Sequence, residues 1–290
     1  MVHFTAEWVA HFQRNFQLNS HFGINPSHFY FRNSFERNAK AGKKDRDFVI
    51  TINLGAIAYL HKTFQPGNSE LLNLNLNKSL IGTDINTLMY QFAIHFTFYH
   101  ELAHLIQMTD SVEDSVEELV NLEETYNERK HLLELDADTY SSLCLGSHVI
   151  QLYENNFSQT KDLQDLIELL SAMCATAFNY VLSFNQGDRQ IYFKEHSHPH
   201  PVIRISCITQ HILEYVQQSF GKDKFTDNMR KAVMHRSFAL VESIYGNEPV
   251  KNYIEILQNN TPEIMEYVAY FRTLDQDPSL AVNRWNASVI

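Results

Sequence analysis

The sequence predicts an α+β protein in which helices predominate and a small sheet precedes one buried helix. The 290 residues include only 9 Gly and 7 Pro, which favours long regular elements over loops. Hydrophobic residues make up 44% of the chain, and many of them recur at helical spacing. The best strand is residues 48–52, where β-branched side chains lie between turn residues.

We expect a single domain over residues 1–290, because no composition break, repeat or low-complexity segment divides the chain. Its core would comprise roughly residues 45–215, between an aromatic-rich segment at 1–40 and a helical region at 216–290. Trp8, Phe12 and Phe16 recur at helical spacing and predict an amphipathic first helix.

Further helices are predicted behind the strand and through the rest of the chain. Asp84 is a good N-cap for a helix that ends near Met108, and Gly146 is expected to end a later one. Residues 73–77 read as a short strand or a loop. The other predicted helices are 54–60, 126–145, 163–184, 204–220, 226–245 and 250–274, with a His/Pro-rich loop at 188–203.

The charge of the chain is concentrated in one segment. Eleven of its acidic residues lie between Asp110 and Asp138, against Arg129 and Lys130, although the whole chain carries a net charge of −11. This balance argues against nucleic acid as a partner, since phosphate binding requires a basic face. We expect the acidic segment to be a flap, partly helical, that could attract basic substrates.

The three cysteines are Cys144, Cys174 and Cys207, and none forms a Cys-x-x-Cys pair. Few, widely spaced cysteines are typical of a reducing compartment, so we expect a cytoplasmic protein. The first residues lack the basic and apolar regions of a signal peptide. Residues 166–184 are the most apolar stretch, but Glu168 and Asn179 within it favour a buried core helix over a membrane span.

The chemistry-bearing motif is His-Glu-x-x-His, formed by His100, Glu101 and His104. Residues four apart lie on one face of a helix, so the two imidazoles can chelate a single metal ion. Glu101 would then stand beside the ion as a general base. The alternative is a helix with two core or surface histidines, because 15 His make a chance match conceivable.

A third ligand is offered by Glu134, with Asp138 one helical turn further on. If Glu134 binds the metal, Asp138 can accept a hydrogen bond from a ligand histidine and fix its tautomer. A solvated acidic helix face is the alternative, but the neighbouring leucines leave little of this helix exposed. Rival third ligands are His131 and the cluster of His196, His198 and His200.

Three motifs in this order resemble the gluzincin peptidases of the HtpX and CAAX-prenyl-protease type. The first begins at His100, the second is Glu-x-x-Ala-Asp beginning at Glu134, and the third is Ser-His-Pro around His198, followed by Arg204. The resemblance covers about residues 85–210. A weaker resemblance, in size and motif only, is to the phage-exclusion Lit peptidase type.

The resemblance implies a zincin-like (gluzincin) core and a role for each site residue. Residues 48–52 would correspond to the strand ahead of the active helix, which can receive a peptide by edge addition. Those peptidases are often embedded in membranes, whereas this chain has no convincing span. The implied roles are zinc ligation by His100, His104 and Glu134, general base catalysis by Glu101, ligand orientation by Asp138, and substrate or oxyanion binding by His198 and Arg204.

The sequence therefore predicts a soluble zinc endopeptidase that acts on a protein or peptide substrate. One alternative is a metal-binding or metal-free interaction protein, whose contact surfaces would be the acidic segment and the aromatic N-terminal region. Another is a zinc hydrolase of a non-peptide bond, since the same ion and base hydrolyse other carbonyls. No oligomeric state is predicted.

Overall fold

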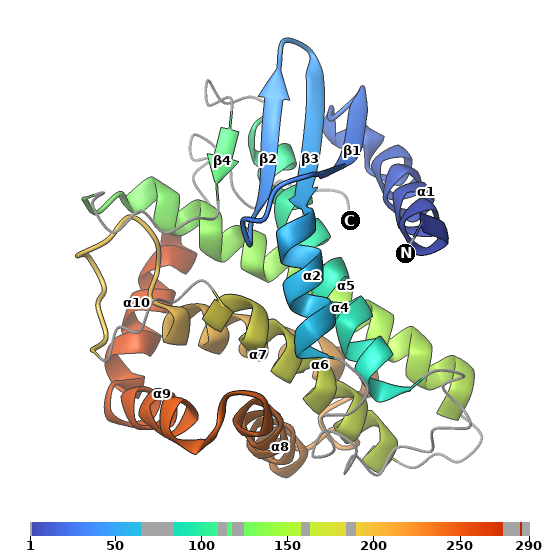
Figure 1. The fold of residues 1–290 in the computed structure, drawn as a ribbon. Helices are drawn as coiled ribbons and strands as arrows, with labels where there is room; N and C mark the ends of the chain where they lie inside the picture. The colour runs from blue at the N-terminus through green and yellow to red at the C-terminus, as the bar shows by residue number, and fades with distance from the viewer. Residues whose placement is uncertain are drawn as a thin grey trace.

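The computed structural model describes residues 2–64, 84–109, 115–117, 125–157, 163–183, 190–274 and 285, and it is predominantly helical with a small sheet, as predicted (Figure 1). The expectation for residues 73–77 lies outside the described residues. The elements are α1 (Val2–Leu18), η1 (Ser20–Phe22), β1 (Ser27–Arg32), β2 (Ala39–Lys44), β3 (Asp47–Asn53), α2 (Leu54–Thr63), α4 (Ile85–Gln107), β4 (Ser115–Glu117), α5 (Glu128–Phe157), α6 (Leu163–Ser183), α7 (Pro201–Phe220), α8 (Asp227–Tyr245), α9 (Asn247–Asn259) and α10 (Thr261–Leu274).

The predicted strand is confirmed as β3, but it lies inside the sheet. The strand order is β1-β3-β2-β4, with β3 parallel to β1 and antiparallel to β2. Ile50 therefore has Phe29 on one side and Ala41 on the other. Because both edges of β3 are hydrogen-bonded, the prediction that this strand receives a peptide by edge addition is wrong.

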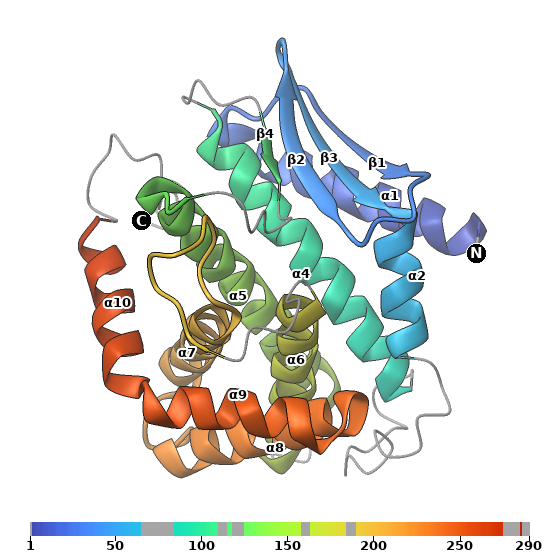
Figure 2. The ribbon, with the colours of Figure 1, turned by 60° about the vertical axis from the view of Figure 1, so that its left-hand side comes forward.

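Part of the acidic segment is also a strand. Ser115–Glu117 forms β4, which pairs antiparallel with β2 and extends the sheet on that side (Figure 2). We expected helix around Val116, but it stands opposite Ala41 in the ladder. The spacing of the apolar residues favours a helix, but at Val116 the pairing with β2, more than 70 residues earlier in the chain, decides the local structure. The flap expectation concerns segments that otherwise lie outside the described residues.

One face of the sheet packs on α1 and α4. Phe29, Ala41 and Ile50 are buried on this face, whereas the alternating Tyr30 is 54% exposed. The ring of Phe12 lies 4.7 Å from that of Phe29 and stacks 4.0 Å from that of Phe98, measured between ring centroids. The predicted first helix is thereby confirmed, and its aromatic residues join the sheet to α4.

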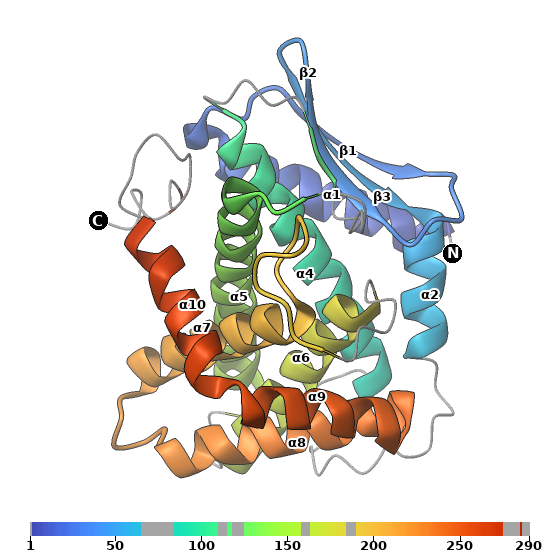
Figure 3. The ribbon, with the colours of Figure 1, turned by 90° about the vertical axis from the view of Figure 1, so that its left-hand side faces the viewer.

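Helix α4 begins in the helical half of the molecule and ends beneath the sheet, and it packs against α5 and α6 (Figure 3). Its predicted N-cap is confirmed, because Asp84 Oδ1 accepts a hydrogen bond of 2.9 Å from the Thr87 amide. Helix α6 is long and apolar enough to cross a membrane by length and composition, but 89% of its most apolar window is buried within the molecule. It therefore has the packing of the buried core helix that the sequence favoured.

Two predicted helix ends are wrong. Gly146 does not end α5, which continues to Phe157; a Cβ atom at this glycine would lie 2.9 Å from Cδ1 of Tyr215, so the glycine allows the close approach of α7. Residues 250–274 form two helices, because Pro262 lacks the amide hydrogen that a continuous helix would use there and instead lies in the first turn of α10.

Gly55 provides a test of the packing between α2 and the β1–β2 connection. A Cβ atom there would lie 2.2 Å from the Phe35 carbonyl oxygen, and backbone atoms cannot move aside as a side chain can. We expect Gly55→Ala to lower the free energy of unfolding by about 1–3 kcal/mol, measured by urea denaturation. Gly146→Ala is the comparison, because its close contact of 2.9 Å is with the Tyr215 side chain, which can shift, and a gain of about 1 kcal/mol in helix propensity offsets part of the cost, so a smaller loss is expected. Equal losses in both variants would contradict this interpretation.

Candidate metal centre

Two neighbouring helices bring three metal-ligating side chains to one point. Helix α4 carries His100 and His104 one turn apart, and α5 lies alongside it and carries Glu134. The two imidazole Nε2 atoms are 3.1 Å apart, and the Glu134 oxygens lie 3.4 Å from His100 Nε2 and 3.5 Å from His104 Nε2. Tetrahedral coordination with bonds of about 2.0–2.1 Å separates neighbouring ligands by about 3.3 Å. The group could therefore hold a metal ion.

The tautomer of His104 is fixed by Gln107. The Gln107 amide nitrogen donates to the Leu133 carbonyl at 3.0 Å and to Asp136 Oδ2 at 2.7 Å. Its oxygen therefore faces His104 Nδ1, 2.8 Å away, and must accept a hydrogen bond from it. With the proton on Nδ1, the lone pair of His104 is on Nε2 and points toward the other ligands.

The tautomer of His100 is fixed in the same sense by Asp138. His100 Nδ1 lies 3.2 Å from Asp138 Oδ1, and an ionised carboxylate can only accept a hydrogen bond. Asp138 is in turn held by Arg204, whose Nε and terminal nitrogen donate to its two oxygens, each at 2.8 Å. This bidentate pair fixes the carboxylate plane, so the proton of His100 is on Nδ1 and its lone pair on Nε2.

The donor set fits a cation. Two imidazole lone pairs and a carboxylate converge at separations of 3.1–3.5 Å, an arrangement that repels itself unless a positive charge lies between the donors. The charges agree with this, because Glu101, Glu134 and Asp138 are each at most 1% exposed. Among the buried side chains of the described residues, Arg204 is the only Lys or Arg. Arg204 balances the charge of one of these three carboxylates, and a divalent cation would balance the charges of the other two.

Both site carboxylates on α5 are held in the ionised form. Burial is the largest influence and raises the pKa of Glu134 and of Asp138, but the charge of Arg204 and the charges and hydrogen bonds of the other neighbouring groups together outweigh it, so both pKa values lie below the ordinary range. The proton that His100 directs at Asp138 contributes in the same direction there. Ionised oxygens at neutral pH are what metal ligation by Glu134 requires.

The loop before α7 adds His198 to the site. The yellow segment in Figure 3 lies across α5 and next to α4, and His198 Nε2 is 3.8 Å from Glu134 Oε1. Its Nδ1 lies 2.9 Å from Ser197 Oγ, so a hydrogen bond fixes the ring on the side opposite Nε2. Arg204, in contrast, directs its guanidinium at Asp138 and lies 3.4 Å from Glu134 Oε2. Arg204 thus holds Asp138 in place, while the substrate or oxyanion roles of His198 and of Arg204 stay predictions.

Two of the rival third ligands, His131 and His200, have other partners. His131 Nε2 lies 2.8 Å from the His196 carbonyl, and its Nδ1 is hydrogen-bonded to the Tyr267 hydroxyl. His200 Nδ1 accepts a hydrogen bond of 3.1 Å from the Val202 amide and so caps α7. Within the described ranges, only the group of His100, His104 and Glu134 has the spacing of a metal site.

Sequence reasoning missed the residues that hold His104. Gln107 lies three residues after His104 on the same helix face, so its position was a usable signal. Asp136 lies within the second motif but was given no role. Trp285 donates its indole N–H to Asp136 Oδ1 at 3.0 Å from 149 residues away, and nothing in the sequence indicates that contact.

No protein-family model, curated protein or solved structure matches this chain.

Arg204 offers a test of the ligand framework. Arg204→Met would leave two buried carboxylates without their cation, so we expect the free energy of unfolding to fall by about 3–5 kcal/mol in urea denaturation. Arg204→Lys keeps the charge but loses the bidentate geometry, and an intermediate loss is expected. Arg230→Met is the matched control, because Arg230 faces the exposed Asp227 at 3.8 Å and should lose no more than about 1 kcal/mol. A similar small loss in Arg204→Met would contradict the framework role.

Proposed function

We propose that this chain is a zinc-dependent endopeptidase of the gluzincin class, with His100, His104 and Glu134 as ligands and Glu101 as general base. The observation that carries the proposal is that the lone pairs of two imidazoles and the oxygens of a buried carboxylate converge on one point. Each imidazole has a partner that fixes its tautomer. A His, His, carboxylate set that leaves a fourth position open is typical of catalytic zinc. When bound, zinc activates a water molecule and polarises the scissile carbonyl.

Glu101 carries the proton. It follows His100 directly on α4 and is 0% exposed, so bulk water does not compete for its carboxylate. In the proposed reaction Glu101 accepts a proton from the attacking water and then delivers it to the departing amine. The buried surroundings strengthen the electrostatic interactions of this carboxylate with the reacting groups.

His198 is the side chain best placed to donate to the oxyanion. Its Nε2 lies 3.8 Å from Glu134, at the edge of the ligand group, and Ser197 contacts the opposite ring nitrogen. A protonated Nε2 would donate to the negative oxygen that develops on the substrate carbonyl. Loss of one such donor typically costs about 3 kcal/mol of transition-state stabilisation.

We assign the substrate class as protein or peptide, and the compartment as the cytoplasm. The substrate class is supported by the three motifs shared with gluzincin peptidases, in the same order along the chain. The compartment is supported by the cysteines, since Cys144, Cys174 and Cys207 are all free thiols, and burial raises the pKa of Cys144 and of Cys174 to about 12. Nucleic acid is not expected as a partner because the net charge is −11.

Metal content is the first test. We expect the purified protein to bind about one equivalent of zinc by elemental analysis, because the described part of the chain offers one complete ligand set. His104→Ala should reduce bound zinc below about half an equivalent. His235→Ala, which changes an exposed histidine of α8, is the control and should bind zinc as the wild type does. Wild-type protein that binds no zinc, even when zinc is supplied, would overturn the proposal.

Substitution of Glu101 tests the chemistry separately from the metal. Glu101→Gln removes the base but keeps side-chain shape, so zinc content should stay the same while cleavage falls by at least about 100-fold. The measurement is the set of new protein N-termini in cells that express each form, by quantitative proteomics. Glu154→Gln, an exposed change on α5, is the control and should cleave normally. Cleavage by Glu101→Gln at the wild-type rate would exclude Glu101 as the base.

The alternative function, a metal-binding interaction protein, gives a different result in the same experiments. It binds zinc, but wild type and Glu101→Gln then produce identical sets of N-termini. Cleavage of a non-peptide bond would also leave the N-termini unchanged, and it would appear instead as a Glu101-dependent change in cellular metabolites.

A further inference from the structure

A line of three hydrogen bonds joins Trp285 to the candidate metal ligand His104. Trp285 Nε1 donates to Asp136 Oδ1 at 3.0 Å, Gln107 Nε2 donates to Asp136 Oδ2 at 2.7 Å, and His104 Nδ1 lies 2.8 Å from Gln107 Oε1. We propose that Trp285 is a positioning residue which, through Asp136 and Gln107, holds His104 in its metal-binding orientation. The inference rests on the metal site of the proposed function and extends it to a residue outside all three motifs.

The direction of each bond follows from the chemistry of the groups. An indole N–H can only donate and an ionised carboxylate can only accept, so Asp136 receives a proton donor on each of its two oxygens. The amide group of Gln107 must then turn its nitrogen toward Asp136 and its oxygen toward His104. The orientation of one end of the line therefore fixes the protonated nitrogen at the other.

The line is protected from water along its inner part. Gln107 is 3% exposed and Asp136 is 6% exposed, so water competes little for these hydrogen bonds. Within the part of the chain that the structure describes, Nδ1 of His104 has no charged partner of the kind that Asp138 provides for His100. Its orientation depends on a neutral amide, and that amide depends on Asp136 being held in place.

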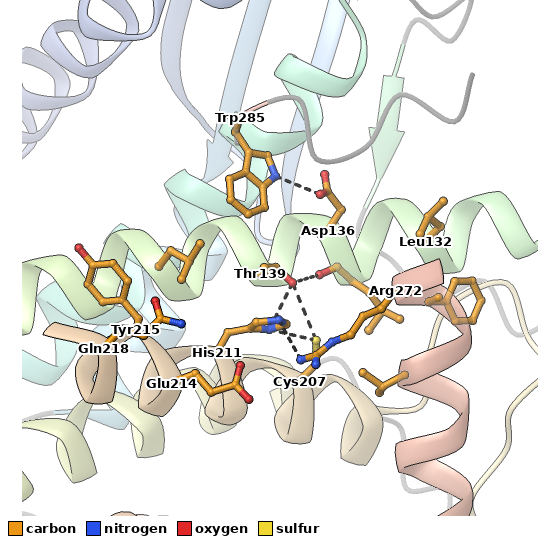
Figure 4. A pocket seen from close by; sticks show the side chains of 14 residues that line it. Leu132, Asp136, Thr139, Cys207, His211, Glu214, Tyr215, Gln218, Arg272 and Trp285 are labelled. Carbon is orange, nitrogen blue, oxygen red and sulfur yellow. Dashed lines mark hydrogen bonds between the residues drawn. The ribbon is translucent and has the colours of Figure 1, made fainter. Parts of the chain in front are cut away.

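The outer end of the line lies at a cavity of about 300 Å³ between α5, α7 and α10 (Figure 4). Trp285 and Asp136 both line this cavity, and the indole is directed at the carboxylate from one side of α5. The Trp285 ring also packs on that of Tyr140, with centroids 5.7 Å apart. A substitution that keeps the ring can thus retain the packing while removing the hydrogen bond.

The test is the zinc affinity of Trp285→Phe, measured by competition with a chelating dye and not by activity. Loss of the N–H frees one oxygen of Asp136 and loosens Gln107, so we expect zinc affinity to fall by about 10-fold, within the range for groups that support a metal ligand. Trp8→Phe is the matched control, because it changes the other tryptophan of the chain, which packs on α4 far from this line, and should leave affinity unchanged.

A double substitution separates positioning from a general structural effect. If Trp285 acts through Gln107, then adding Trp285→Phe to Gln107→Ala should lower zinc affinity no further than Gln107→Ala alone. A full additional 10-fold loss, or an affinity of Trp285→Phe within twofold of the wild type, would overturn the inference and leave the proposed function intact. Wild-type protein that binds no zinc would overturn both.

The line can also be tested with every group in it unchanged. In the Trp8→Phe variant, Trp285 is the only tryptophan, so the fluorescence emission comes from this residue alone. We expect zinc to shift that emission, because the metal draws charge from His104 and polarises the hydrogen bonds behind it. His104→Ala in the same background should abolish the shift. A zinc-dependent shift that persists without His104 would contradict the connection.

Discussion

The structure of the site depends on the convergence of two imidazole lone pairs and one carboxylate at separations of 3.1–3.5 Å. Such a group is unfavourable in the interior of a protein unless a cation binds it, because like charges and lone pairs repel more strongly where the dielectric is low. The packing of α4 against α5 imposes this arrangement, since the ligands are on buried faces of both helices. The fold therefore brings together a group that could hold a cation.

The two histidines are held by chemically different partners. His100 faces a carboxylate that is clamped by Arg204, so its support is charged and strong. His104 faces the amide of Gln107, which takes its orientation from Asp136 and the Leu133 carbonyl. A charged support makes its imidazole a better electron donor, whereas an amide fixes geometry with less effect on basicity. The two ligands are thus tuned differently although they lie on one helix turn.

The parts of the fold that the sequence predicted correctly are those decided locally. The N-cap at Asp84, the aromatic stripe of the first helix and the four-residue spacing of the histidines all follow from periodicity within one element. Errors arose where distant segments meet. The sequence around Gly146 predicts a helix end, but the glycine lies within α5 and makes room for Tyr215. The sequence around Val116 predicts helix, but this residue pairs with β2.

The same division applies to the site. Glu134 and Asp138 could be found from their spacing, because a helix places residues four apart on one face. The partner of Arg204 could not be deduced, since it depends on how α7 packs against α5 in the tertiary structure. Sequence order placed Arg204 in the correct region, and only packing shows that its fork faces Asp138. The contact of Trp285 with Asp136 is more remote still and has no local signature.

These distant contacts have a thermodynamic consequence. Binding free energies are reciprocal, so any contact that raises the metal affinity of the ligand group is itself strengthened by the metal to the same degree. Arg204 and Trp285 reach α5 from α7 and from the C-terminal segment, respectively. A cation at the ligand group would thus strengthen the contact of Arg204 with Asp138 and that of Trp285 with Asp136. Loss of the cation would weaken both contacts. Metal binding and the packing of Arg204 and Trp285 against α5 are therefore thermodynamically coupled.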